Sequence, residues 1–218
     1  MADTQGEHPE TYEYIDKYVE PYIKEKGIRF TTLVTPVHDG KGIAPTASLE
    51  EFCLARKMTP SRMNRWCTER FKIKRIANYV RDSGHRPAIA VMGISWDESH
   101  RIHESHSRVY SFEYPLVDKR LTREDCERII QNYGWPVPPK SGCFYCPFQR
   151  LRGWRDLYHR HPDLFKRARN LEESQQHYPR YVLAGNGSTL AKIAVSLGEG
   201  SMKLDDFGDS CKDGYCET

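Results

Sequence analysis

The amino-acid sequence predicts an α/β protein built on a doubly wound parallel sheet. Segments typical of strands alternate with segments typical of helices along the chain, the order expected when helices cover a mostly parallel sheet. Residues 88–94 (AIAVMGI) form an almost continuous apolar run, as expected of a strand that is covered on both faces. The length of 218 residues is sufficient for a buried core and indicates one domain.

The first predicted element is an amphipathic helix at residues 9–26. Pro9 suits its first turn, apolar and aromatic side chains recur at helical spacing, and Gly27 can end it. Residues 28–35 follow as a strand, because β-branched and aromatic residues dominate there. Residues 36–45 are rich in Gly and Pro and are therefore predicted to form a loop.

Two shorter helices come next, at residues 48–57 and 73–81, and the second is expected to end near Gly84. The apolar strand follows them. A further strand is predicted at residues 109–114. A helix then begins with the capping sequence Leu-Thr-Arg-Glu-Asp and runs over residues 121–133.

The last predicted helices lie at residues 154–159 and 162–173. From Gly185 onward the chain is rich in Gly, Ser and Asp, so we expect a flexible tail over residues 185–218. The α/β domain is accordingly predicted to span residues 1–184.

The sequence lacks features of membrane insertion or export, and we expect a cytoplasmic protein with no membrane partner. No apolar run approaches the roughly 18 residues that span a bilayer. The first ten residues are polar and acidic, unlike a signal peptide.

The chain contains seven cysteines. Their odd number argues against a disulfide framework in a chain without export features. Metal binding or redox chemistry is the better expectation for them.

Basic residues gather in two stretches, although the net charge is only +3. Residues 56–81 contain nine Lys or Arg and one acid, and residues 150–169 contain seven basic residues against two acids. Solvated helix faces and anion-binding sites both produce such patterns. The presence of Cys67 in the first stretch favours an anion site there.

Three cysteines form the strongest candidate site. Cys143 and Cys146 make a CxxC motif that lets two thiolates bind one ion or cluster, and Pro147 matches the Cys-Pro ending of some iron–sulfur motifs. A third thiolate must be supplied by folding, and Cys67 is the best candidate. Three thiolates would leave a fourth position on iron or zinc, open to substrate or filled by another group.

The remaining cysteines have weaker signals. Cys53 and Cys126 have no motif around them and are expected to pack as small apolar residues. Cys211 and Cys216 lie near the last residue, where a cysteine can act as a nucleophile, donate a further ligand or have no role.

Charged residues directly follow the apolar strand. Asp97, Glu98 and Arg101 occupy this place, and ligands in open α/β sheets collect beyond the carboxyl ends of strands. The alternative is an ordinary polar turn with a local ion pair.

Five blocks of the sequence together resemble successive motifs of the phosphoadenosine phosphosulfate reductase family. The resemblance covers about residues 2–175 and implies a Rossmann-like parallel sheet flanked by helices, of the adenine nucleotide alpha hydrolase type. It also implies an adenine nucleotide such as ATP, and sulfur chemistry. The blocks are ADTQGEHPETY from Ala2, Cys67-Thr68 with Phe71-Lys72, GISWDE from Gly93 with Arg101, Tyr114-Pro115-Leu116, and Ser141-Gly142-Cys143 with Cys146-Pro147-Phe148.

Within that family the cysteine pattern is similar to the iron–sulfur members, such as adenylylsulfate reductases and the sulfur-inserting proteins of DNA phosphorothioation. It implies a 4Fe-4S cluster on Cys67, Cys143 and Cys146 with one open iron, similar to that of tRNA thiolation enzymes; zinc is the alternative. The reductases place a nucleophilic cysteine in Glu-Cys-Gly-Leu-His near the C-terminus. Cys216, in Tyr-Cys-Glu-Thr, occupies that place without matching the motif.

The chain differs from the family at its start. Family members open with a strand and a Ser-Gly-Gly phosphate loop before the Ala-Asp-Thr block, whereas this sequence begins at that block. The N–H groups of such a loop hold phosphates. Residues 39–42 (DGKG) and 185–188 (GNGS) are partial substitutes. We expect that the missing unit is supplied by a companion chain, was lost by truncation, or is no longer needed.

Three functions agree with these patterns. The first is a sulfur-transfer or sulfonucleotide-reducing enzyme whose positive charges contact an anionic group. The second is a sulfur-inserting component of a DNA or tRNA modification system, whose basic stretches bind the nucleic-acid backbone. The third is a non-catalytic remnant stapled by zinc. The candidate substrate-binding residues are Lys72, Lys74, Arg75, Asp97, Glu98, Arg101 and Arg123.

Overall fold

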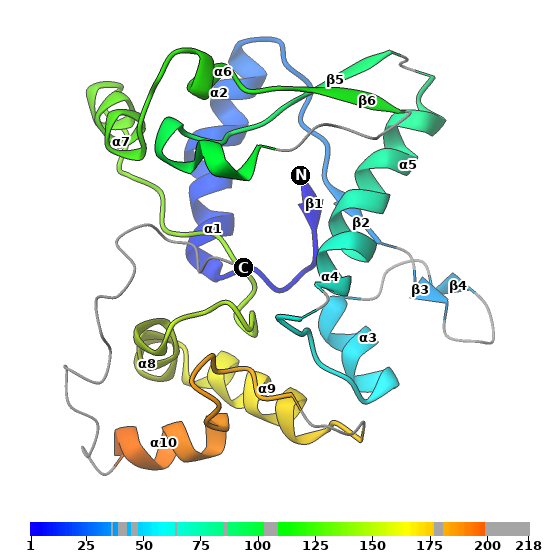
Figure 1. Ribbon diagram of the computed structural model, residues 1–218, viewed down its shortest axis with the longest axis vertical. Helices are drawn as coiled ribbons and strands as arrows, with labels where there is room; N and C mark the ends of the chain where they lie inside the picture. The colour runs from blue at the N-terminus through cyan, green and yellow to red at the C-terminus, as the bar shows by residue number, and fades with distance from the viewer. Residues whose placement is uncertain are drawn as a thin grey trace. The chain divides into compact units, whose positions relative to one another are not determined.

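The computed structural model describes residues 1–35, 37–38, 43–44, 48–63, 65–84, 87–102, 109–176 and 181–198. The chain folds into two compact units where the sequence indicated one domain. Unit 1 consists of Met1–His8, Thr32–Lys72 and the described residues from Gly142 onward, and unit 2 consists of Pro9–Thr31 and Ile73–Ser141. Each unit combines helices with a small parallel strand pair, so the architecture is α/β in the coarse sense (Figure 1).

Unit 1 is mostly helical. Its parallel pair joins β1 to β2, with Ala2 opposite Leu33, and a separate antiparallel pair joins β3 to β4. The predicted strand at residues 28–35 is therefore formed only at its last part. The elements are β1 (Ala2–Asp3), β2 (Leu33–Val34), β3 (Val37–His38), β4 (Ile43–Ala44), α3 (Leu49–Arg56), α4 (Trp66–Thr68), the π-helical turn η2 (Glu69–Ile73), α8 (Leu151–Arg160), α9 (Pro162–Glu173) and α10 (Leu190–Gly198).

Helix α3 has the capping interactions that its local sequence predicts. The N–H of Glu51 donates to Ser48 Oγ at 3.1 Å, and the N–H of Ser48 donates to Glu51 Oε2 at 2.8 Å, which closes a capping box. At the other end Lys57 adopts a left-handed conformation with φ of 52°. The helix predicted at residues 48–57 is confirmed.

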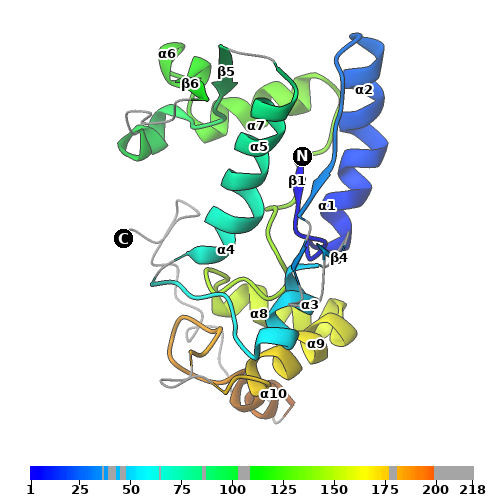
Figure 2. The same ribbon diagram turned by 90° about the vertical axis from the view of Figure 1, so that its right-hand side faces the viewer.

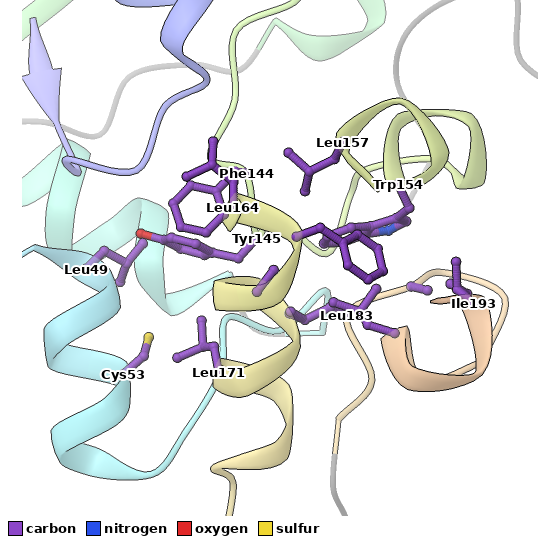
Figure 3. Packing of buried hydrophobic residues seen from close by; sticks show 14 of the residues in the cluster. Leu49, Cys53, Phe144, Tyr145, Trp154, Leu157, Leu164, Leu171, Leu183 and Ile193 are labelled. Carbon is purple, nitrogen blue, oxygen red and sulfur yellow. The ribbon is translucent and has the colours of Figure 1, made fainter. Parts of the chain in front are cut away.

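The core of unit 1 lies around α9, which contacts α3, α8 and α10. Tyr145, Trp154, Leu171 and Leu183 are fully buried there (Figure 3). Burying this much aromatic and aliphatic surface is the main stabilising contribution to the unit.

Helix α10 corrects the prediction of a flexible tail from Gly185 onward. Leu190 and Ile193 are buried in the same core, so this segment folds because it covers apolar surface. The part of the predicted tail after α10 lies outside the described residues.

Unit 2 contains the long predicted helix of residues 9–26, which is confirmed. The helices predicted at 73–81 and 121–133 are also confirmed, and they end at Gly84 and Gly134, which both have positive φ. The elements are α1 (Pro9–Tyr14), the π-helical turn η1 (Ile15–Val19), α2 (Glu20–Glu25), α5 (Lys74–Asp82), β5 (Ala88–Val91), the 3₁₀ helix η3 (Trp96–Arg101), β6 (Tyr110–Glu113), α6 (Pro115–Asp118) and α7 (Arg123–Asn132).

Strands β5 and β6 pair in parallel, with Ala88 opposite Tyr110 (Figure 2). The parallel pairing agrees with the prediction for the apolar run. The prediction that both faces are covered is wrong, since the side chains of Ile89 and Val91 are 58% and 65% exposed. Successive side chains point to opposite faces of a strand, and only one face of β5 is packed.

The helices of the described residues are short or polar. None of them has both the length and the apolar character that a membrane crossing requires.

Candidate thiol site

The CxxC motif forms a tight turn in unit 1. The N–H of Cys146 donates to the carbonyl of Cys143 at 2.9 Å, and the N–H of Gln149 donates to the carbonyl of Cys146 at 3.0 Å. Between the cysteines, Phe144 and Tyr145 are buried in the core beside α9 (Figure 3). The two aromatic rings therefore fix the backbone that carries both thiols.

The N-terminal segment of unit 1 lies directly against this turn. The N–H of Phe144 donates to the carbonyl of Gly6 at 2.8 Å, and Glu7 forms an isolated antiparallel bridge with Cys143. The hydroxyl of Thr4 is 3.0 Å from the sulfur of Cys143. Gly6 has to lack a side chain, because a Cβ there would collide with the ring of Tyr145. Two blocks far apart in the sequence thus form one site.

Cys67 reaches the same neighbourhood from a third part of the chain. It lies in α4 next to Trp66, whose ring packs 5.6 Å from that of Phe52, and the indole N–H donates to the carbonyl of Thr59 at 3.3 Å. A negative charge on Cys67 raises the pKa of the Cys146 thiol. Cys146 therefore interacts electrostatically with Cys143 and with Cys67.

The environment of the CxxC thiols keeps them protonated. Burial raises the pKa of Cys143 to about 12, with a further increase from Glu7, whereas Thr4 and Lys72 act in the opposite direction. Burial also raises the pKa of Cys146. The backbone N–H of Phe148 donates to the sulfur of Cys146 and partly offsets this increase in the pKa. In the described ranges no three His, Cys, Asp or Glu side chains are grouped closely enough to hold a single metal ion.

Lys72 is the predicted anion-binding residue that lies beside these thiols. Its ammonium is 3.5 Å from Glu7 Oε1. Burial opposes the charge of Lys72, but Glu7, Cys143 and Cys146 outweigh it and raise its pKa. The other carboxylate oxygen of Glu7 is buried and has no hydrogen-bond partner in the described part of the chain. A cation and an incompletely satisfied carboxylate therefore adjoin the CxxC turn.

The protonated state predicts slow alkylation of Cys143 in the metal-free protein. Raising the pKa from 9.0 to about 12 lowers the thiolate fraction at pH 8 about 1,000-fold, and only the thiolate reacts. Iodoacetamide labelling followed by peptide mass spectrometry should show modification at Cys143 increasing tenfold per pH unit between pH 8 and 11. A plateau of the rate near pH 9 would contradict the assigned environment.

The remaining predicted anion-binding residues belong to unit 2, and those that follow the apolar strand are engaged locally. The N–H of Arg123 donates to Asp97 Oδ1 at 3.0 Å, and Arg101 pairs with Glu98 at 3.4 Å. These contacts agree with the alternative of a polar turn with a local ion pair. Lys74 is exposed on α5, and the Nε of Arg75 is buried without a hydrogen-bond partner among the described residues.

Sequence reasoning assigned no site role to four residues near the thiols, which are Thr4, Glu7, Cys53 and Tyr145. Thr4 and Glu7 lie in the first block of the family resemblance, but no local pattern indicates that they contact the thiols. Cys53 is fully buried, as expected of a packing residue, but Cys67 and Cys143 both raise its pKa in addition to burial. The hydroxyl of Tyr145 is buried without a hydrogen-bond partner in the described ranges, and the same thiols raise its pKa after burial itself.

Of the two candidate phosphate loops and the candidate nucleophile, the structure describes only the loop at residues 185–188. Residues 39–42 and Cys216 lie outside the described residues. Residues 185–188 do precede a helix, because α10 begins at Leu190. The carboxylate of Glu172 accepts the N–H of Leu190 at 2.7 Å, so an acid already occupies the position where a phosphate would bind.

The chain was compared with known proteins in three ways. No model of a protein family, no curated protein and no solved structure matches it.

Proposed function

We propose that this chain is a sulfur-transfer or sulfonucleotide-reducing protein similar to the iron–sulfur members of the phosphoadenosine phosphosulfate reductase family. In this proposal Cys67, Cys143 and Cys146 hold a 4Fe-4S cluster, and the fold is a Rossmann-like variant of the adenine nucleotide alpha hydrolase type. The observation that carries the proposal is the convergence of the CxxC turn, the Thr4–Glu7 segment and Lys72 within one unit.

The donor set suits a cluster better than a single zinc ion. Ligands of one tetrahedral zinc each lie about 2.3 Å from the metal, so their sulfurs must surround one point. Each cysteine of a 4Fe-4S cluster binds a different iron atom, which requires wider spacing. When bound, a cluster with one iron free of cysteine supplies a position for exogenous sulfur.

The protein groups around the thiols have defined tasks in this proposal. Lys72 offsets the negative charge that accumulates when the cysteines ionise. Its side chain is 41% exposed, so it can also contact an anionic group that arrives from solvent. The Thr4 hydroxyl can donate to Cys143 once that sulfur is a thiolate.

Metal analysis of protein prepared without oxygen tests the proposal. Reconstitution with ferrous iron and sulfide should give a brown protein with about four irons and four sulfides per chain. A colourless protein that contains stoichiometric zinc would support the stapled remnant and overturn the cluster. The reconstitution should be done at pH 8 or above, because the thiols must lose protons to bind metal.

A further inference from the structure

Two arginine side chains lie over the ring of Phe148, directly after the CxxC-Pro sequence. The guanidinium carbons of Arg62 and Arg65 are 5.4 and 5.3 Å from the ring centroid. Attraction to the ring face helps to hold the two cations near one another. Within the described part of the chain, neither guanidinium group forms an ion pair or a hydrogen bond. Their donors are available to an external anion.

A pocket of about 250 Å³ opens beside this arginine pair. Arg62 lines it together with Tyr181, Gly185 and Gly187. A Cβ at residue 185 would collide with the guanidinium of Arg62, so a larger residue there would require the flexible end of this arginine to move. The side chain of Tyr181 is 37% exposed and offers an aromatic surface at the pocket. The site therefore combines positive charge with two aromatic rings.

Phe148 connects this pocket to the thiols. Its backbone N–H donates to the sulfur of Cys146, while its ring carries the two arginines. Arg150 and Arg152 follow on the exposed surface at the start of α8, and they too form no ion pair with a described residue. A ligand held by the arginines would lie next to the CxxC turn.

The chemistry of the site specifies a phosphate ester that carries accessible bases. Guanidinium groups bind phosphate through two parallel hydrogen bonds, which a lysine does not offer. Aromatic rings and guanidinium planes stack on nucleic-acid bases, and they can do so only where the bases are unpaired. Four arginines here, Arg62, Arg65, Arg150 and Arg152, form no ion pair with a described acidic residue. Four such cations favour a ligand with several phosphates over a ligand with one phosphate.

We propose that Arg62, Arg65 and Phe148, with the adjoining pocket, bind single-stranded nucleic acid and hold it beside Cys146. This inference rests on the proposed function for the chemistry at the thiols, and it names the substrate class of that site. Binding itself requires no cluster, because none of the three residues belongs to the donor set.

Fluorescence anisotropy with a fluorescein-labelled 20-nucleotide single-stranded DNA of mixed sequence tests the inference. The Arg62→Ala/Arg65→Ala variant should bind about 10- to 100-fold more weakly than the unmodified chain. The slope of log affinity against log salt should become shallower by about 1.4, since about 0.7 is lost for each phosphate contact on a single strand. Gly185→Ala should weaken binding in the same direction by displacing Arg62.

The matched control removes two charges elsewhere in unit 1. Arg160 and Lys166 are exposed on α8 and α9, and Arg160 lies about 14 Å along α8 from its first residue. The Arg160→Ala/Lys166→Ala variant should bind within about twofold of the unmodified chain. Arg62→Lys/Arg65→Lys should recover only part of the lost affinity, because lysine keeps the charge without the planar fork.

Several outcomes would overturn the assignment. These are equal losses in the two double variants, no measurable binding of the oligonucleotide, or equally tight binding of double-stranded DNA. Full displacement by AMP at concentrations near those of the oligonucleotide would indicate a free nucleotide as the ligand instead. Thermal melting verifies that each variant is folded. Anisotropy is measured with and without bound iron. If the protein binds the oligonucleotide but cannot be loaded with a cluster, the proposed function is refuted and the nucleic-acid site is not.

Discussion

Replacement of Cys143 by serine is expected to remove most of the iron from the anaerobically reconstituted protein. The sulfur of Cys143 adjoins Thr4, Lys72 and Cys146, and a serine hydroxyl does not replace a thiolate as an iron ligand. The loss should be at least about tenfold, since even groups that only orient a ligand change metal affinity by about 10- to 100-fold. Iron and sulfide are measured per chain, together with the visible absorption of the cluster.

Two other cysteines provide controls for this experiment. Cys126 lies on α7 in unit 2, and Cys126→Ser should keep the full iron content. Cys53→Ser should also keep it, although the variant is expected to unfold more easily because Cys53 is fully buried. If all three variants lost iron equally, the ligands would be wrongly assigned. Iron loss in Cys53→Ser alone would move Cys53 into the ligand set in place of Cys143.

Replacement of Glu172 by alanine is expected to lower the free energy of unfolding by about 2–5 kcal/mol. The buried carboxylate of Glu172 accepts the N–H groups of Leu183 at 2.8 Å and Leu190 at 2.7 Å. Alanine would leave two buried donors without partners, and each such donor costs about 1–3 kcal/mol. Urea denaturation followed by circular dichroism gives the difference directly.

The neighbouring glutamate is the matched control. Glu173 lies on the same helix with a side chain that is 55% exposed, and it pairs with Arg169 at 3.5 Å. Glu173→Ala should change the free energy of unfolding by less than about 1 kcal/mol, because exposed ion pairs contribute little. Similar values for both variants would show that Glu172 does not stabilise the start of α10.

The helices could be predicted from the sequence because their signals are local. Ser48 with Glu51 and Thr122 with Asp125 form capping boxes, and glycines end several helices. The strand at residues 28–35 was predicted too long, since residue composition does not specify which residues find a pairing partner. Helix α10 was missed, because its buried side chains and the contact of Leu190 with Glu172 depend on the folded core, although Thr189 also caps its start.

The candidate site was predictable only to the extent that a motif marks it. The CxxC spacing identified Cys143 and Cys146, and the basic stretch led to Lys72. Thr4 and Glu7 are separated from the motif by more than 130 residues, and no periodicity or spacing indicates contacts of that kind. Phe148 appeared as part of a motif, but the arginines over its ring became apparent only in the folded chain.

The arrangement of unit 1 has a consequence for biosynthesis. Its segments flank Ile73–Ser141, so 76 positions (143 minus 67) separate Cys67 from the CxxC turn. At about 5–20 residues per second, a ribosome needs about 4–15 s to make that stretch. During this interval the first thiol leaves the exit tunnel without its partners. If the proposed cluster forms, its assembly must therefore await completion of the turn, and premature oxidation of Cys67 would compete with it.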